Sequence, residues 1–214
     1  MTDFGKRAEE RVQTICSKMF FSDFTVRSPK YTKPDRNQKE AADIWFPFND
    51  VLIVFQVKSK QEKKLSGKTI VDYGRITRKV EEGINQLKTI KRALRNNRFS
   101  ALKTVKGYDM PFNCSAVRKT TGVVILDLIG EERIPPEDRT SIWNGFTVKF
   151  GIPIHVFMRQ DFEAISTELD TIPDFLKYLE VKEKIRSIEK SFLFGEELDF
   201  LTLYKTNWPL VDDL

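Results

Sequence analysis

Apolar residues return along this chain at two different spacings, and the two spacings predict helices and strands. The first segment with helical spacing is residues 4–20, which should form an amphipathic helix. Its apolar positions are Ala8, Val12, Ile15, Cys16 and Met19. Residues 75–97 predict a second amphipathic helix, whose apolar stripe consists of Val80, Ile84, Leu87, Ile90 and Leu94.

Three strands are expected between these two helices. Residues 24–33 alternate loosely between apolar and polar side chains, as a half-buried strand does. The apolar runs 41–48 and 51–58 are separated only by Asn49-Asp50, a pair typical of tight turns. They therefore predict a β-hairpin, which a charged connection joins to the second helix.

The second half of the chain completes an α/β pattern. The expected elements are a loop-rich insertion at 98–121, strands at 122–126 and 152–158, and helices at 161–169 and 173–188. This order predicts a three-layer α/β/α fold with a central mixed sheet. Residues 4–188 would form one domain, and the acidic segment 189–214 would be a C-terminal appendage.

The composition limits the compartment and the kinds of metal site. The chain has two cysteines, Cys16 and Cys114, and one histidine, His155. A disulfide framework, a thiolate zinc site and a histidine-rich metal site are thereby excluded. Any metal would have oxygen ligands, which favours Mg²⁺ or Mn²⁺. Since no run of ~20 apolar residues and no signal-like N-terminus occurs, we expect a cytoplasmic protein with no membrane partner.

The net charge of +5 conceals an uneven distribution along the chain. Residues 1–120 hold 26 Lys and Arg against 13 Asp and Glu, whereas residues 121–214 hold 10 against 18. A strongly basic half supplies the field expected of a polyanion binder, and it is equally compatible with an ordinary solvated surface. The acidic half could serve a protein partner or a homodimer contact.

The predicted hairpin brings three polar residues together. With Asn49-Asp50 as its turn, Asp43 lies opposite Gln56, at a position where the strands approach most closely. Lys58 lies two residues beyond Gln56 and so projects on the same face. Burying a carboxylate, an amide and an ammonium together is costly unless they are paired or bind an ion.

Two other interpretations of this hairpin stay open. Pro47 cannot donate to the ladder, and a bulge at Pro47 would shift Asp43 out of direct opposition to Gln56. Asp43 and Lys58 could also form a buried ion pair of structural importance only, with Gln56 completing its hydrogen bonds.

The same residues resemble a known signature. Asp43 followed by Gln56-Val57-Lys58 at the end of an apolar strand resembles the D…(E/Q)xK motif of the PD-(D/E)xK, or restriction-endonuclease-like, nuclease superfamily. The QxK form resembles the Mrr-like branch of that superfamily. Gly5-Lys6-Arg7-Ala8-Glu9 is similar to the first-helix G…E pattern of many members. The resemblance covers roughly residues 4–130 and implies an αβββαβ core.

The first helix offers two carboxylates for this pattern. On a helical wheel Glu9 lies at the flank of the apolar stripe, where it can reach the sheet edge. Glu10 lies nearly opposite the stripe and should be solvated. We therefore expect Glu9 to be the functional residue, with an ordinary surface carboxylate as the alternative.

The resemblance assigns roles to these residues. Asp43 would be the principal Mg²⁺ ligand and Glu9 a direct or water-mediated one, while Gln56 would contribute its side-chain oxygen and Val57 its main-chain carbonyl. Lys58 would position the attacking water and stabilise negative charge. Gln86, on the second helix, resembles a glutamine of several nuclease families, although an exposed helix former explains it equally well.

Basic residues follow the motif and predict a path for a nucleic acid backbone. These residues are Lys60, Lys63, Lys64, Arg75, Arg78 and Lys79. Together these features predict a Mg²⁺-dependent nuclease that cleaves DNA, in prokaryotic restriction, repair or mobile-element defence. Because a glutamine replaces the commoner acid, the alternative is a catalytically inactive nucleic-acid-binding or scaffolding subunit of a defence complex.

Overall fold

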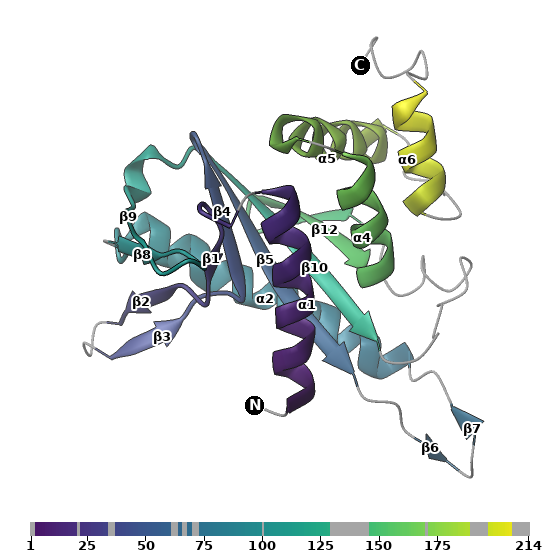
Figure 1. Cartoon of the computed structure of the whole chain (residues 1–214), viewed down its shortest axis with the longest axis horizontal. Coiled ribbons are helices and arrows are strands. Elements are labelled where there is room, and N and C mark those ends of the chain that lie inside the picture. The colour runs from purple at the N-terminus through teal and green to yellow at the C-terminus, as the bar shows by residue number, and fades with distance from the viewer. Residues whose placement is uncertain are drawn as a thin grey trace.

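The computed structural model describes residues 3–20, 22–33, 37–60, 64–65, 68–69, 73–99, 101–128, 146–169, 171–188 and 197–206 of the 214-residue chain. Over these residues the architecture is α/β, with a mixed six-stranded sheet between two layers of helices (Figure 1). The three-layer α/β/α fold class predicted from the sequence is confirmed.

The sheet has the strand order β1-β4-β5-β10-β12-β11. Its strands are β1 (Val26–Arg27), β4 (Ile44–Phe48), β5 (Val51–Lys60), β10 (Lys119–Leu128), β11 (Phe146–Lys149) and β12 (Ile152–Met158). The central strand β10 is parallel to both of its neighbours, β5 and β12. The outer pairs β1–β4, β4–β5 and β11–β12 are antiparallel.

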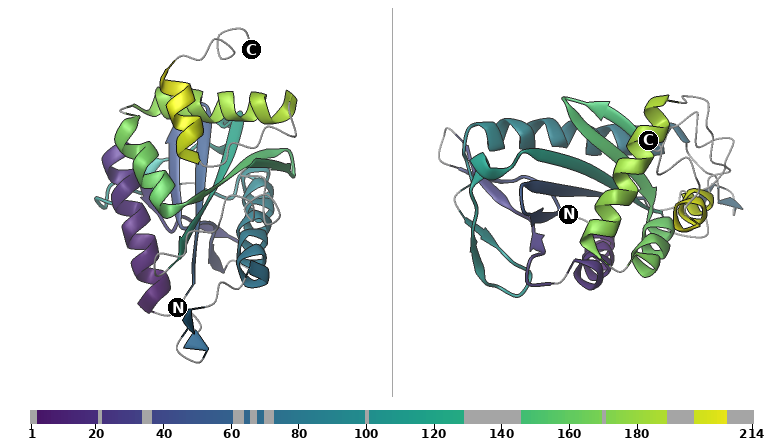
Figure 2. Two further views of the ribbon diagram at one scale, coloured as in Figure 1. Left: turned by 90° about the vertical axis from the view of Figure 1, so that its right-hand side faces the viewer. Right: turned by 90° about the horizontal axis from the view of Figure 1, so that it is seen from above.

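Helices cover both faces of the sheet. The face toward the N-terminal helix is covered by α1 (Asp3–Met19), α4 (Arg159–Glu168), α5 (Ile172–Ile188) and α6 (Glu197–Lys205), whose buried side chains form one apolar cluster with the sheet. The opposite face is covered by α2 (Tyr73–Arg95). Figure 2 shows the sheet edge-on, with α1 and α4 on one side and α2 on the other.

The apolar stripes read from the sequence are the surfaces that face the sheet. Ala8 and Val12 of α1 are fully buried, and so is Leu87 of α2. A methyl group added at Gly122 of β10 would lie 2.4 Å from Cδ1 of Leu87, so glycine allows α2 to pack directly on the middle of the sheet. None of the helices in the described ranges is long and apolar enough to cross a membrane.

The structure corrects one expected strand and adds strands that were not predicted. The single strand expected at 24–33 is broken at Ser28, which has a positive φ of 46°. The residues after the break form β2 (Lys30–Thr32), which pairs with β3 (Gln38–Glu40) outside the main sheet. Strand β11, at the sheet edge, was not predicted.

The segment expected to be a loop-rich insertion, 98–121, also contains regular structure. It holds the hairpin β8 (Ala101–Lys103) and β9 (Asp109–Pro111), the short 3₁₀ helix η1 (Cys114–Ala116) and the start of β10. The charged connection before α2 contains a pair of two-residue strands, β6 (Lys64–Leu65) and β7 (Lys68–Thr69). The predicted appendage, 189–214, contains α6, and Phe200 and Leu201 of that helix are buried in the α1-side cluster.

Candidate active site

The β4–β5 hairpin has the register predicted from its turn. Phe48 pairs with Val51 and Ile44 pairs with Phe55, without a bulge. Pro47 lies opposite Leu52, at a position where neither residue donates to its partner, so the missing N–H of proline costs no hydrogen bond. The alternative in which Pro47 shifts the register is therefore excluded.

Asp43 lies where β4 separates from β5. Its main-chain carbonyl accepts a hydrogen bond of 2.8 Å from the N–H of Ser28, next to β1. Its side-chain Oδ2 accepts one of 2.5 Å from the main-chain N–H of Val57. The carboxylate thus replaces the missing strand partner of Val57, which fixes it in the gap between the two strands.

The gap also receives a main-chain oxygen. In an antiparallel ladder the N–H and C=O of one residue point to the same edge of its strand. Because the N–H of Val57 reaches Asp43, the carbonyl of Val57 faces the same gap. A carboxylate and a main-chain carbonyl, the two oxygen donors predicted for this position, therefore share one side of β5.

Lys58 projects from β5 toward α2. Its Nζ donates a hydrogen bond of 2.7 Å to Oε1 of Gln86. A methyl group added at Gly83 would lie 3.1 Å from Cγ1 of Val124 and 3.4 Å from Cε of Lys58, so the glycine lets α2 pack closely on β10 with the lysine stem alongside. Gln86 thus contacts Lys58. The sequence alone had left two interpretations of Gln86, a residue of the site or an exposed residue that favours helix formation.

Of the two candidate carboxylates on α1, Glu9 joins the cluster. Its side chain is half-buried, and the charges of Asp43 and Lys58 both act on its pKa. The side chain of Glu10 is 48% exposed and lies 3.8 Å from a guanidinium nitrogen of Arg27. The helical wheel distinguished the two correctly.

Burial perturbs all three charged groups of this cluster. Burial and the nearby carboxylates of Asp43 and Glu40 raise the pKa of Glu9 from 4.5 to about 7. Burial also raises the pKa of Asp43, against the opposing effects of Lys58 and the N–H of Val57. Burial lowers the pKa of Lys58 even though Asp43 favours its charged form. Titratable groups shifted in this way by burial and by each other are typical of functional sites.

These groups fit a divalent cation with a partly hydrated shell. Among the residues that the structure describes, no three His, Cys, Asp or Glu side chains are placed to hold a metal ion. The cluster supplies two carboxylates, Asp43 and Glu9, so the further ligands would be the oxygens of Gln56 and Val57 and water. Mg²⁺ commonly keeps several waters and takes only one or two carboxylates. A cation would also favour the ionised forms of both carboxyl groups, whose pKa values burial and the neighbouring carboxylates raise.

Gln56 is the most enclosed member of the motif. It is only 1% exposed, and its amide nitrogen donates a long hydrogen bond of 3.4 Å to the carbonyl of Ala41. The amide oxygen is its one donor atom for a cation. Because Gln56 is neutral, it adds no charge to the two carboxylates.

The structure describes only some of the side chains predicted to form the basic path. Arg75 and Arg78 are exposed on the first turns of α2, and Nζ of Lys79 pairs with Glu82 at 2.6 Å. The charges of Lys79 and Glu82 both act on the pKa of Lys58, which places this end of α2 beside the cluster. Lys63 and the side chains of Lys60 and Lys64 lie outside the described residues.

Two buried polar residues outside the cluster have charged partners on the helices that cover the sheet. His155 is fully buried, with Nε2 3.2 Å from Oε1 of Glu183. Asp127, only 2% exposed at the end of β10, accepts hydrogen bonds from Arg11 of α1 at 3.0 Å and from Arg159 at 3.2 Å. These bonds tie helices to the sheet.

Sequence reasoning missed Glu40 and Gly83. Glu40 raises the pKa values of both Glu9 and Asp43. The only feature of the sequence that pointed to Glu40 was its position three residues before Asp43. Gly83 lies inside a helical pattern, where glycine usually has a packing reason. The sequence therefore contained a feature from which a close contact at Gly83 could have been predicted.

No family model matches this chain, and no curated protein or solved structure matches it either. What the chain does is therefore inferred from its own residues.

The raised pKa of Glu9 predicts a specific pH dependence of stability. Since the pKa is about 7 in the folded chain against 4.5 when unfolded, folding favours the protonated form. The metal-free protein should lose stability as pH rises from about 4.5 to about 7. Glu9→Gln stays neutral and should show a smaller loss. Urea unfolding in EDTA, near pH ~5 and pH ~8, measures this, with Glu10→Gln as the control. Equal pH dependence in all three proteins would contradict the assignment of Glu9.

Proposed function

We propose that this chain is a metal-dependent nuclease that hydrolyses DNA phosphodiester bonds. The observation that carries the proposal is the carboxylate of Asp43, fixed by the N–H of Val57 in the gap beside β5, with Lys58 and Glu9 electrostatically coupled to it. The contact of Asp43 with Val57 and its electrostatic coupling to Lys58 and Glu9 support the PD-(D/E)xK resemblance.

The residues divide the chemistry between them. Asp43 and Glu9 would hold Mg²⁺ or Mn²⁺ together with the oxygens of Gln56 and Val57. The bound ion would act as a Lewis acid on the scissile phosphate. Lys58, held by Gln86, donates to the attacking water or to a phosphate oxygen, and its positive charge stabilises the charge that develops as water adds to phosphorus.

The charge distribution favours a nucleic acid as the substrate, and we take this nucleic acid to be DNA. Lys79 of α2 acts on the pKa of Lys58, and Arg75 and Arg78 are exposed on the same end of that helix. The basic half of the chain contains the whole cluster. Such residues bind phosphates without reading sequence. We place the protein in the cytoplasm of a prokaryote, in restriction, repair or mobile-element defence, with the acidic C-terminal half as a surface for a protein partner or a second copy.

One observation favours the alternative of an inactive nucleic-acid-binding or scaffolding subunit. Gln56 replaces the acid of the commoner motif, and its amide is bonded to Ala41 inside the fold. The cluster then has two carboxylates, so its affinity for a divalent cation would be lower than that of a three-carboxylate site.

Incubation of the purified protein with supercoiled, linear and single-stranded DNA separates the two functions. The nuclease should cut with Mg²⁺ or Mn²⁺ and stop on addition of EDTA. Salt-sensitive binding without cutting under either metal would support the binding subunit and overturn the nuclease.

A further inference from the structure

A two-stranded ribbon stands apart from the main sheet next to the candidate site. It consists of β2 and β3, and Figure 1 shows it projecting from the three-layer body. The ladder pairs Lys30 with Glu40 and Tyr31 with Lys39. The N–H of Lys33 donates to the carbonyl of Asn37 at 2.9 Å, which continues the pairing toward the tip. The ribbon is thus a regular hairpin rather than a loose loop.

The ribbon touches the body through one aromatic residue. Tyr31 is 6% exposed, and its ring lies 5.9 Å from that of Phe99. The other residues of β2 and all residues of β3 are exposed and polar. A hairpin with so little apolar surface gains little from packing, so its exposed lysines are available to a partner.

The exposed side chains carry positive charge on both faces. Opposed residues of an antiparallel pair project on the same side. Lys30 therefore lies on one face with Glu40, and Lys39 lies on the other face with Tyr31. Strand alternation places Lys33 on the face of Lys39. Three lysines against one glutamate leave the described part of the ribbon positive.

The base of the ribbon adjoins the site. Only Ala41 and Ala42, both buried, separate Glu40 from Asp43. The charge of Glu40 acts on both Asp43 and Glu9, so the ribbon leaves the body beside these carboxylates. Arg75 and Arg78 belong to α2, and Tyr31 of the ribbon packs in the apolar cluster that lies on the same face of the sheet as α2. The ribbon and these exposed arginines therefore belong to the same side of the sheet.

We propose that the β2–β3 ribbon binds the phosphate backbone of double-stranded DNA next to the scissile bond, through Lys30, Lys33 and Lys39. This inference rests on the proposed function, because it takes DNA to be the substrate. A two-stranded ribbon fits the major groove of B-DNA, and its lysines can reach the phosphates that flank the groove. Contacts of this kind supply affinity and salt dependence but no sequence preference.

Binding of a labelled DNA duplex in EDTA tests the ribbon without interference from cutting. The variant K30Q/K33Q/K39Q should bind more weakly than the wild type, with a slope of log affinity against log salt smaller by about 2 to 3. Between roughly 50 and 200 mM salt, the wild type should lose about 40-fold more affinity than the variant. Unchanged slope and affinity in the variant would overturn the inference.

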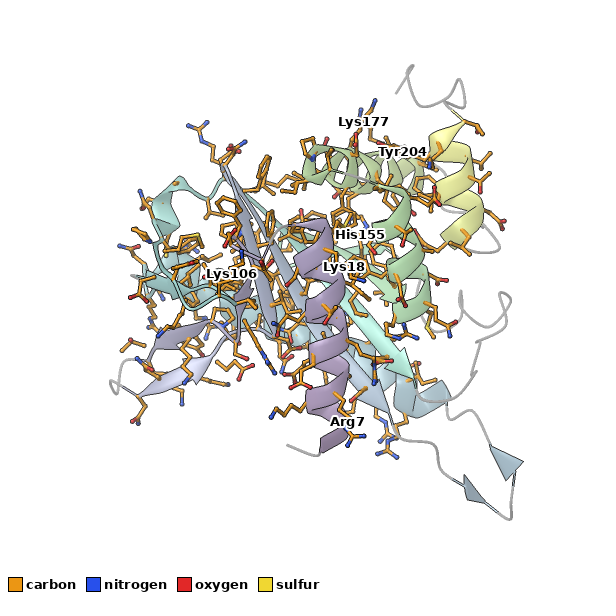
Figure 3. All side chains as sticks on the ribbon, viewed as in Figure 1. Arg7, Lys18, Lys106, His155, Lys177 and Tyr204 are labelled. Carbon is orange, nitrogen blue, oxygen red and sulfur yellow. The ribbon has the colours of Figure 1, made fainter. Side chains whose placement is uncertain are left out.

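A matched variant controls for total charge. K18Q/K149Q/K177Q removes three exposed lysines from α1, β11 and α5. Figure 3 shows Lys177 at the end of the molecule opposite Arg7, whose helix begins beside the site. This control should keep the wild-type slope, and an equal decrease in both variants would overturn the ribbon. A smaller slope in the ribbon variant alone, in a protein that never cuts DNA, would support the ribbon and reject the nuclease.

Discussion

Replacing Asp43 with asparagine should abolish Mg²⁺-dependent DNA cleavage while the protein remains folded. Asparagine keeps an oxygen that can accept the hydrogen bond from the N–H of Val57, so the contact of this side chain with β5 is retained. It removes the negative charge that would hold the cation. Loss of one group that stabilises transition-state charge typically lowers the rate by roughly 10²–10³-fold, and weaker metal binding adds to this decrease.

The stability of this variant should not fall. Burial raises the pKa of Asp43, so the ionised carboxylate is less favourable in the folded chain than in the unfolded chain. The neutral amide avoids that cost. The thermal midpoint should therefore equal or exceed that of the wild type, which separates a lost function from a lost fold.

Single-turnover cleavage, Mn²⁺ titration by calorimetry and thermal unfolding together measure the effect. Asp50→Asn is a suitable control, since Asp50 is exposed in the turn of the same hairpin. The control should cut and bind Mn²⁺ like the wild type. Cleavage by Asp43→Asn at the wild-type rate would show that the reaction does not depend on this carboxylate.

The parts of the site that depend on local pattern were predictable from the sequence. Asn49-Asp50 fixed the register of β4 and β5, and Asn49 has the positive φ of 52° that a tight turn of this kind requires. The confirmed register ends at the pair Ile44–Phe55, one residue before Asp43, so the direct opposition of Asp43 and Gln56 stays a prediction. Alternation along β5 directs Lys58 to the face covered by α2, where it contacts Gln86. The apolar stripe of α1 placed Glu9 on the flank that meets the sheet. Each step uses a period or a turn within about 20 residues of chain.

The parts that depend on distant packing were not predictable in this way. The break at Ser28 needs a positive φ that the residue type does not signal, so β1 and β2 were read as one strand. The ribbon and the β8–β9 hairpin have short strands, too short for a clear alternation. Glu40 lies near the site because the chain returns along the ribbon to its base. The burial of Asp127 is explained by its hydrogen bonds from Arg11 of α1 and Arg159 of α4.

Replacing Lys58 with methionine should remove cleavage without weakening the fold. Methionine keeps an unbranched apolar side chain in the space beside Gly83, so the packing against α2 is retained. Burial lowers the pKa of Lys58, which means that the charged form costs free energy in the folded chain. Loss of the ammonium should reduce the single-turnover rate by roughly 10²–10³-fold, because a positive charge at the reacting phosphate is lost.

DNA binding should change far less than the rate. One phosphate contact lowers the salt slope by about 0.9, so Lys58→Met should bind a duplex in EDTA with nearly wild-type salt dependence. Lys149→Met, at an exposed position on β11, removes the same charge and should leave both the rate and the binding unchanged. If Lys58→Met cut DNA as fast as Lys149→Met, the lysine would be a structural partner of Asp43 and Gln86. The buried ion pair would then be the correct interpretation of this motif.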